Sequence, residues 1–305
     1  MNILVAGASG FIGQKLVEAL QADHHVSVLG RDLAKLARDF PKNISSLSWD
    51  KLSDYNASNY DVVINLCGYN ISASRWNADI KEKIISSRVS TTNTLIDWII
   101  KHNAKPHFIC ANAVGIYGLQ ENGNKTELDE DSPIDFEHPH DFMSSIGVRW
   151  EQALQPAIDY GLQVTTTRFG IVLDKNQGIL KKLTPSFYLG MGAVIGDGKQ
   201  IMSWVHIDDV VGALLFLIHK PELTGAFNLT APHPISQAEF ARSLASAMHR
   251  PLFLTLPDFA IRMLFGEMGE CLLLKGQRVV PKRLLQLGYQ FQYPDLQKAL
   301  LHDYP

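Results

Sequence analysis

Three glycines follow an apolar stretch at the start of the chain. The sequence "LVAGASGFIG", residues 4–13, carries Gly7, Gly10 and Gly13 in the pattern Gly-x-x-Gly-x-x-Gly. The first glycine permits a tight turn, the second lets the backbone approach a pyrophosphate, and the third lets a helix pack closely on a strand. Free N–H groups at the helix start then hold the anion. The stretch therefore predicts a dinucleotide site, and a plain glycine-rich turn is the alternative.

The end of the next predicted strand bears on which dinucleotide is bound. An acidic residue there holds the ribose hydroxyls of NAD, but Gly30 occupies that position, 17 residues after Gly13, and Arg31 follows it. An arginine pairs with the 2′-phosphate of NADP, and a glycine removes a carboxylate that would repel this phosphate. The sequence therefore favours NADP. Asp32 keeps NAD open as the less favoured cofactor, and a solvated loop cation is the alternative role for Arg31.

A strand, helix, strand unit positions these residues. "NILVAGA" is typical of a buried strand, "FIGQKLVEALQAD" has apolar residues at helical spacing, and "HHVSVLGRD" is typical of a second strand. The unit has the length of a right-handed parallel crossover. The alternation continues with predicted strands at 61–68, 106–115 and 162–173 and predicted helices at 79–103 and 149–161. The pattern predicts an α/β fold with a Rossmann-type, doubly wound parallel sheet.

The character of the chain changes after Leu173. A glycine-rich loop at 189–200 precedes a helical segment at 206–220, and another helix is predicted within 231–251. We expect the helix near 207–219 to pack back on the sheet, and the ligand site to lie in the cleft between two lobes. The predicted division is an NADP-binding domain at 1–173 plus about 203–222, and a smaller C-terminal α/β substrate lobe at 174–202 and 223–305.

The composition excludes several classes of partner. A net charge of −3 and a pI near 6.4 give no basis for binding nucleic acid or an anionic membrane. The three cysteines are far apart and lie in apolar stretches, which predicts reduced, structural thiols. No His, Cys, Asp or Glu cluster has metal-ligand spacing. Without a targeting segment or a long apolar run, we expect a cytoplasmic protein, as a monomer or a homodimer.

Several short motifs carry a family resemblance. With "AGASGFIG", "NLCG" at 65–68, "AVGIYG" at 113–118 and "SWVHIDD" at 203–209, the chain resembles the extended short-chain dehydrogenase/reductase superfamily. More narrowly, it resembles the atypical branch called the epimerase family, whose substrate is unknown and which is nucleotide-sugar epimerase-like. The resemblance runs nearly from end to end.

The resemblance implies an NADP-type cofactor across the carboxyl ends of the strands. Its pyrophosphate would lie on the loop residues Gly7, Ala8, Ser9, Gly10, Phe11, Ile12 and Gly13. Arg31 would take the 2′-phosphate, and Asp50 would approach the adenine. The backbone of Leu66, Cys67 and Gly68 would line the adenosine and the nearer ribose. Ala111 and Asn112 would face the nicotinamide side. Ordinary loop roles stay open for Asp50 and Asn112.

The superfamily's proton-transfer residues do not match. These are a tyrosine, a lysine four residues later and a helping serine, and the lysine lowers the pKa of the phenol. None of the nine tyrosines here has a lysine four places on. Phe142 stands at the tyrosine position, Ile146 at the lysine position and Asn112 at the serine position. Since a phenyl ring cannot exchange a proton, catalysis by this pair is excluded.

Three residues are candidates for the missing chemistry. Tyr117 leads for proton handling, followed by Asn112, and Arg88 leads for anion binding. The alternative for Tyr117 is a half-buried ring bonded to the backbone. A guanidinium on an apolar helix face needs an anionic partner, so Arg88 would meet either a bound carboxylate or phosphate or a structural glutamate.

Two aspartates follow a histidine in the motif at 203–209. For His206, Asp208 and Asp209, capping of a helix is favoured over a catalytic triad, because no nucleophile is paired with them. The sequence as a whole favours an NADP-dependent oxidoreductase or epimerase-like enzyme that acts on an unknown small molecule without the usual tyrosine and lysine. The alternative is a non-catalytic NADP(H)-binding sensor or regulatory protein.

Overall fold

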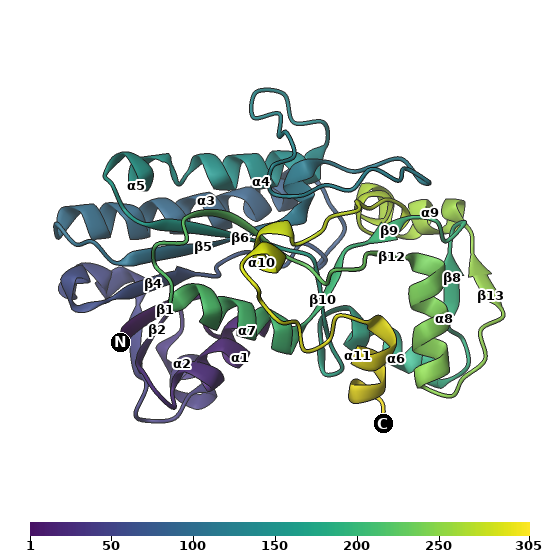
Figure 1. Cartoon of the computed structure of the whole chain (residues 1–305), viewed down its shortest axis with the longest axis horizontal. Helices are drawn as coiled ribbons and strands as arrows, with labels where there is room; N and C mark the ends of the chain where they lie inside the picture. The colour runs from purple at the N-terminus through teal and green to yellow at the C-terminus, as the bar shows by residue number, and fades with distance from the viewer.

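The computed structural model describes residues 1–305 and contains a seven-stranded parallel sheet (Figure 1). The strand order is β11-β6-β5-β4-β1-β2-β3, and every pair is parallel. The strands are β1 Asn2–Ala6, β2 His25–Gly30, β3 Ser45–Ser48, β4 Val62–Asn65, β5 His107–Ala113, β6 Val164–Phe169 and β11 Gly225–Leu229. The predicted Rossmann-type sheet is confirmed.

Helices cover both faces of this sheet. One face carries α3 Ala78–Lys101, α4 Phe142–Gln152 and α5 Gln155–Asp159, and the other carries α1 Phe11–Leu20, α2 Leu33–Asp39 and α7 Ile207–Ile218 (Figure 1). Successive side chains of a strand point to opposite faces. Accordingly, Ile3 and Val5 of β1 join the core under α1 and α7, whereas Leu4 and Ala6 join the core under α3. Burial on both faces explains why these strands are almost continuously apolar.

The strand order reverses at β1. From β1 the chain builds the sheet outward through β2 and β3, and then returns to the other side of β1 with β4, β5 and β6. A crevice opens at the carboxyl ends of the strands where such a reversal occurs, and ligands of doubly wound sheets bind there. The residues that follow β1 and β4 therefore form the first place to search for a site.

The second lobe begins where a predicted strand breaks. Residues 162–173 form β6 and a separate strand, β7 Ile171–Asp174, because a Cβ on Gly170 would lie 2.4 Å from the Ser203 carbonyl oxygen. β7 pairs with β10 Trp204–His206. The other elements of this lobe are α6 Gly178–Tyr188, β8 Ala193–Ile195, β9 Ile201–Met202, β12 Ile235–Ser236, α8 Gln237–Ala247, β13 Leu254–Leu256, α9 Asp258–Gly269, α10 Lys282–Gln286 and α11 Leu296–Asp303. A third apolar core holds α6, α8 and α11 together.

Two further boundaries differ from the predictions. The predicted substrate lobe included everything from 223 onward, whereas β11 at Gly225–Leu229 pairs with β6 and is an edge strand of the main sheet. The predicted helix at 149–161 is the end of α4 followed by the separate α5, which has a proline in its first turn. No helix is long and apolar enough to cross a membrane.

Candidate functional site

The turn after β1 is built so that only glycine fits at its two ends. Gly7 has a φ of +80°, and a Cβ there would lie 2.7 Å from the Leu66 carbonyl carbon. A Cβ on Gly13 would lie 2.5 Å from the Gly7 carbonyl oxygen and 2.7 Å from the Cα of Ala8. The Gly10 N–H donates to the Gly7 carbonyl at 3.0 Å and closes the turn. The turn therefore brings β1, α1 and the end of β4 into direct backbone contact.

The first turn of α1 is left open to an anion. Its N-cap, Gly10, has no side chain to accept from the first N–H groups, and no acidic residue lies in the first turn. Uncapped N–H groups and the positive end of the helix dipole together favour a phosphate. Ala8 is buried, whereas Ser9, Phe11 and Ile12 are part-buried around the same opening. The residues present therefore fit a pyrophosphate.

The end of β2 presents a cation and an already engaged carboxylate. Asp32 caps α2, where its Oδ1 accepts the Lys35 N–H at 3.0 Å. Arg31 is exposed, and its charge only partly offsets the burial that raises the pKa of the Cys67 thiol after β4. Asp50 is exposed in the short helix Trp49–Asp54, and a hydrogen bond from Ser48 lowers its pKa. An arginine without a competing carboxylate suits a 2′-phosphate better than a ribose diol.

The backbone after β4 forms the other wall of the crevice. The Leu66 N–H donates to the Ala6 carbonyl at 2.9 Å, and the Cys67 N–H donates to Asn65 Oδ1 at 3.1 Å. Burial raises the pKa of the Cys67 thiol to about 12, so this group is neutral and structural. At Gly68, a Cβ would lie 3.0 Å from Cζ of Arg88. The predicted backbone wall at 66–68 is therefore adjacent to the Arg88 guanidinium.

Of the two partners expected for Arg88, the structural glutamate is absent, and the bound anion stays a prediction. The arginine's Nη1 donates to the carbonyls of Ile84 at 2.7 Å and Tyr69 at 3.1 Å, and its Cζ lies 5.0 Å from the centre of the Trp150 ring. No glutamate pairs with it, although burial lowers its pKa to about 10. Carbonyls and an aromatic face hold the cation in place, and the charge itself is not neutralised by a side chain.

Asn112 belongs to a buried network beneath α4. Its Nδ2 donates to the Gly147 carbonyl and to Glu151 Oε2, both at 3.1 Å, and its Oδ1 accepts the Ala113 N–H at 2.8 Å. Glu151 Oε1 in turn pairs with Arg168 Nη2 at 2.6 Å. Asn112 is 2% exposed, and its neighbour Ala111 is 5% exposed. Its amide is thus fully hydrogen-bonded within the protein.

The same network reaches Tyr117. The Tyr117 hydroxyl accepts from Arg168 Nη1 at 2.8 Å and donates to Asn228 Oδ1 at 2.9 Å. Burial raises the pKa of this phenol, against the opposing effect of Arg168. The Tyr117 hydroxyl therefore both donates and accepts a hydrogen bond within the protein. The catalytic assignments of Tyr117, Asn112 and Arg88 stay predictions.

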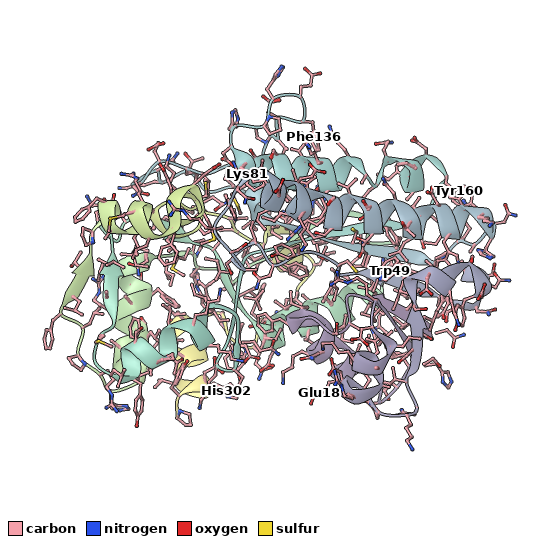
Figure 2. All side chains as sticks on the ribbon, turned by 180° about the vertical axis from the view of Figure 1, so that it is seen from behind. Glu18, Trp49, Lys81, Phe136, Tyr160 and His302 are labelled. Carbon is pink, nitrogen blue, oxygen red and sulfur yellow. The ribbon has the colours of Figure 1, made fainter.

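The positions of the usual tyrosine and lysine hold no proton-transfer group. Phe142 begins α4, and its ring lies edge-on to Trp76 with centroids 4.9 Å apart. The Lys81 ammonium lies 4.8 Å from the Phe142 ring centre and pairs with Glu267 of α9; Figure 2 labels Lys81 at this junction. Ile146 is buried in the core. The start of α4 therefore offers an apolar ring and a buried isoleucine where the superfamily has its proton-transfer pair.

The histidine and aspartates near 206 have structural roles. The His206 ring, rather than an aspartate, caps α7, since its Nδ1 accepts the Asp208 N–H at 3.3 Å. Asp209 accepts the N–H groups of Gln292 at 2.6 Å and Tyr293 at 2.9 Å, so it fastens the C-terminal segment. The preference for capping over catalysis agrees with this geometry, although the capping residue differs.

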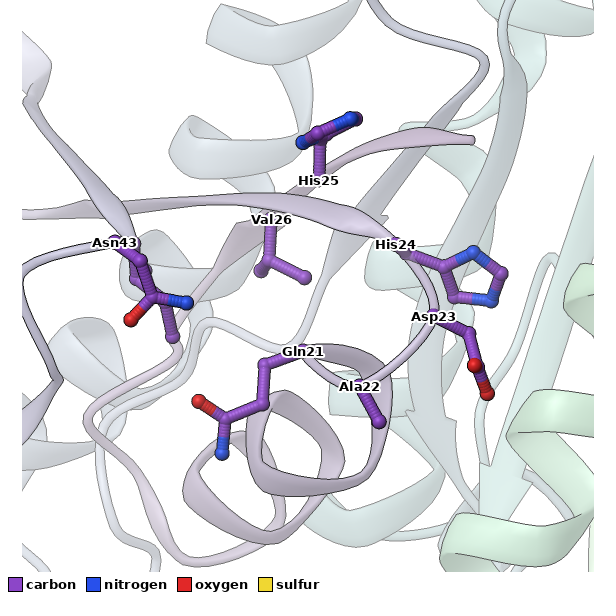
Figure 3. Close-up of a pocket in the computed structure, with 8 residues that line it drawn as sticks. Gln21, Ala22, Asp23, His24, His25, Val26 and Asn43 are labelled. Atoms are coloured by element: carbon purple, nitrogen blue, oxygen red, sulfur yellow. The ribbon is translucent and has the colours of Figure 1, made fainter.

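Two surface hollows lie away from the crevice. One, of about 390 Å³, lies at the amino end of β2 and is lined by residues that include Gln21, His24 and Asn43 (Figure 3). The other, of about 460 Å³, lies on the outer surface between α3 and α4. No group of three His, Cys, Asp or Glu side chains is placed to share a metal ion. Neither hollow brings together the predicted site residues.

Sequence reasoning missed Glu151 and Arg168. They lie on α4 and β6, and their pairing depends on how the helix packs over the sheet. The one available signal is an arginine inside an otherwise uncharged strand, "VTTTRF", because a buried cation requires a partner.

Comparison with known proteins is consistent with these features. The profile of the NAD dependent epimerase/dehydratase family matches residues 3–230, and that of a domain of unknown function matches residues 256–302. The chain is 36% identical to the epimerase family protein SDR39U1 of Bos taurus over 306 residues, which cover 98% of each protein. It is 35% identical to the epimerase family protein Mb2239 of Mycobacterium bovis over 302 residues, 98% of this chain and 96% of the relative.

Solved structures share the whole architecture. The crystal structure of human epimerase family protein SDR39U1 (isoform 2) with NADPH superposes with a TM-score of 0.89 at 32% identity, covering 100% of this chain and 99% of that one. UDP-glucuronic acid 4-epimerase from Bacillus cereus with NAD gives a TM-score of 0.75 at 19% identity, over 100% and 97% of the two chains. At that identity the second likeness concerns the fold alone.

Proposed function

The chain belongs to the NAD-dependent epimerase/dehydratase family, and from this premise we propose that it is an NADP(H)-dependent oxidoreductase or epimerase-like enzyme. The observation that carries the proposal is the turn after β1, where Gly7 and Gly13 have no room for a Cβ and α1 starts uncapped. Such a turn holds a pyrophosphate at the reversal point of a parallel sheet. The substrate is an unidentified small molecule.

Two observations favour NADP over NAD. Gly30 leaves no carboxylate at the position where NAD would need a ribose acceptor, Asp32 uses Oδ1 to cap α2, and the exposed Arg31 is free for a phosphate. The human relative with 32% identity was solved with NADPH, whereas more distant relatives of the same fold were solved with NAD. In the proposed complex, Arg31 binds the 2′-phosphate and the backbone at 66–68 lines the adenosine.

The protein's own contribution is binding and orientation. A bound nicotinamide cofactor supplies hydride transfer. The chain holds the pyrophosphate on the α1 amides, and the apolar pair Phe142 and Trp76 closes one side of the β5 end. Proton exchange with the substrate then involves a group outside the usual tyrosine and lysine positions, and Tyr117 remains the first candidate.

A non-catalytic sensor of NADP(H) is the second candidate function. The specific observation in its favour is that Phe142 and the buried Ile146 replace both groups of the proton-transfer pair. A screen of NADPH oxidation against a panel of aldehydes and ketones separates the sensor from an oxidoreductase. Turnover of any carbonyl supports the oxidoreductase, and tight NADPH binding with no turnover contradicts it. An epimerase returns the hydride to its substrate, so it is detected by the epimerised product and not by NADPH oxidation.

A titration with both cofactors tests the proposed binding. We expect tighter binding of NADPH than of NADH, and an NADPH affinity about tenfold lower in Arg31→Ala with NADH binding unchanged, since one charge-assisted contact is lost. Fluorescence of the reduced nicotinamide gives both constants. Arg38→Ala, at an exposed arginine in the last turn of α2, is the matched control. Equal affinity for the two cofactors, unaltered by Arg31→Ala, contradicts the assignment of NADP.

A further inference from the structure

Arg278 of the second lobe is a part-buried cation without a partner. Its Nε is buried and has no hydrogen-bond partner, and its two terminal nitrogens make no hydrogen bond or ion pair but remain accessible. The other part-buried arginines all donate to protein oxygens; they are Arg88, Arg168, Arg250 and Arg283. A buried N–H left without an acceptor is destabilising, so such a group in a folded protein calls for an explanation.

The backbone that carries Arg278 is firmly fixed. The Arg278 N–H donates to Gln120 Oε1 at 2.7 Å, and its carbonyl accepts the Leu128 N–H at 2.7 Å. The Ser203 hydroxyl donates to the Gln277 carbonyl and accepts the Val279 N–H, both at 2.8 Å. Hydrogen bonds therefore hold the residues on both sides, and only the guanidinium is left unsatisfied. A fixed backbone that carries an unpaired guanidinium is the arrangement expected of a pre-organised binding residue.

The same segment docks on the carboxyl edge of the sheet. Gln277 Nε2 donates to the carbonyl of Val114 at 3.3 Å, and Val114 is the residue directly after β5. In the sheet, β5 is separated from β1 by β4. Arg278 is thus mounted where the second lobe meets the β5 end, away from the glycine turn that follows β1. An anion at Arg278 would accordingly be distinct from the cofactor's pyrophosphate.

The acidic side chains of the adjoining segments do not pair with Arg278: the exposed Glu127 makes no ion pair, and three others are engaged elsewhere. Glu121 pairs with Lys275 at 3.2 Å. Glu130 accepts the N–H groups of Asn228 at 2.9 Å and Arg283 at 3.3 Å. Asp131 pairs with Lys282 and Arg283. No protein carboxylate therefore neutralises Arg278.

We propose that Arg278 binds an oxyanion of the substrate, a carboxylate or a phosphate, at the junction of the two lobes. A guanidinium presents parallel N–H groups that match the two oxygens of either anion. That the anion is part of a substrate rests on the proposed function, whereas the anion site itself does not. The site makes a neutral sugar or a plain hydrocarbon carbonyl a poor substrate.

An NMR titration of the full chain tests this site. The protein, labelled with ¹⁵N-arginine and loaded with NADPH, is titrated with sodium phosphate and separately with sodium succinate, with sodium chloride at equal ionic strength as the reference. The Nε–Hε signal of Arg278 is identified by its absence in Arg278→Lys. We expect this signal to shift saturably with at least one oxyanion, and the arm that saturates distinguishes phosphate from carboxylate.

Arg250 supplies the internal control. Its Nε already donates to the Tyr188 carbonyl at 2.8 Å, so its signal should not respond. Calorimetry should show that Arg278→Gln weakens binding of the responding anion at least tenfold, with Arg278→Lys in between, because a lysine keeps the charge but loses the paired N–H groups. An Arg278 signal that ignores both oxyanions, or responds equally to chloride, overturns the proposal.

A second readout needs no variant. Phenylglyoxal modifies accessible guanidinium groups, and mass spectrometry locates the product. Bound oxyanion should slow modification of Arg278 in the wild-type chain and leave Arg250 unaffected; equal rates with and without the anion also overturn the proposal. NADPH affinity is measured on the same samples. If Arg278 responds to an oxyanion but the protein does not bind NADPH, only the cofactor proposal is refuted. If the protein binds NADPH but Arg278 responds to neither oxyanion, only the anion site is refuted.

Discussion

The turns after β1 and β5 lie at the same edge of one sheet, and they treat polar groups in opposite ways. After β1, glycines keep side chains out, and the first N–H groups of α1 have no cap. At the end of β5, Arg168 donates to Tyr117, and Glu151 accepts from both Arg168 and Asn112. One turn leaves its polar groups for a ligand, whereas the other uses them for the fold.

This contrast separates a binding site from a structural cluster. Residue types alone do not, since a tyrosine, an arginine and a glutamate would suit catalysis equally well. The decisive property is whether a polar atom is already hydrogen-bonded within the protein. By this criterion, the α1 amides and Arg278 are the groups that we propose for ligand binding, and the network after β5 supports the packing of α4 on the sheet.

The largest expected effect comes from breaking the network after β5. Glu151→Ala leaves Arg168, whose side chain is 4% exposed, without its carboxylate, and should lower the free energy of unfolding by about 3–5 kcal/mol. NADPH affinity of the folded fraction should change little. Urea denaturation measures the first quantity and nicotinamide fluorescence the second. Asp197→Ala, which breaks the exposed pair with Lys199, should cost at most about 1 kcal/mol. Equal costs for the two variants contradict a structural network.

In the turn after β1, a substitution should affect NADPH affinity more than the free energy of unfolding. In Gly13→Ala the new Cβ meets backbone atoms of Gly7 and Ala8, so the turn must shift. We expect NADPH affinity to fall about tenfold or more, and the free energy of unfolding to fall by about 1–3 kcal/mol. The same two measurements apply. Gly288→Ala is the control for NADPH binding: a Cβ there meets nothing within 4 Å, and although its φ of +75° strains an alanine, it should leave NADPH affinity intact. An unchanged NADPH affinity in Gly13→Ala contradicts the proposal that this turn binds the pyrophosphate.

The smallest effect is expected for Tyr117→Phe. Loss of the hydroxyl removes two hydrogen bonds at the edge of the network and should cost about 1–2 kcal/mol. Because burial raises the folded-state pKa of this phenol, the unfolded chain releases the proton first as the pH rises above about 10. The wild type therefore loses stability above that pH, and the difference between it and the variant should narrow.

Turnover sharpens the same test. Tyr289→Phe removes a hydroxyl that donates to the Asp209 carbonyl, far from the β5 end, and serves as the matched control. If a carbonyl substrate is found and Tyr117→Phe abolishes its reduction while Tyr289→Phe does not, Tyr117 is catalytic despite its network. Equal activity of both variants leaves it a purely structural residue.

Local patterns predicted the sheet well, and long-range pairing limited the rest. Buried strands such as Val62–Asn65 are recognisable because both of their faces are covered. The break at Gly170 could not be predicted, since the Ser203 carbonyl that requires it lies far along the chain. The edge strand β11 was missed because five residues, "GAFNL", carry little periodicity and pair with the distant β6.

The site divides in the same way. The glycine turn and Arg31 are local in sequence, so their spacing alone identified them. The partners of Tyr117 and Asn112 come from β6, α4 and β11, and no spacing rule links them. Arg278 is identified only by what it lacks, which requires the positions of all surrounding acceptors.

Because β11 and α7 come late in the chain, the main sheet cannot finish folding early in synthesis. Val210, Leu214 and Leu217 of α7 share a core with Ile3 and Val5 of β1. A nascent chain emerging from the ribosome cannot cover that face until residues beyond 207 have been synthesised, and the sheet gains its last strand only with 225–229. A fragment ending near 173 would expose this apolar surface and aggregate. The nucleotide-binding half is therefore not a module that can be transplanted without the segment that returns to it.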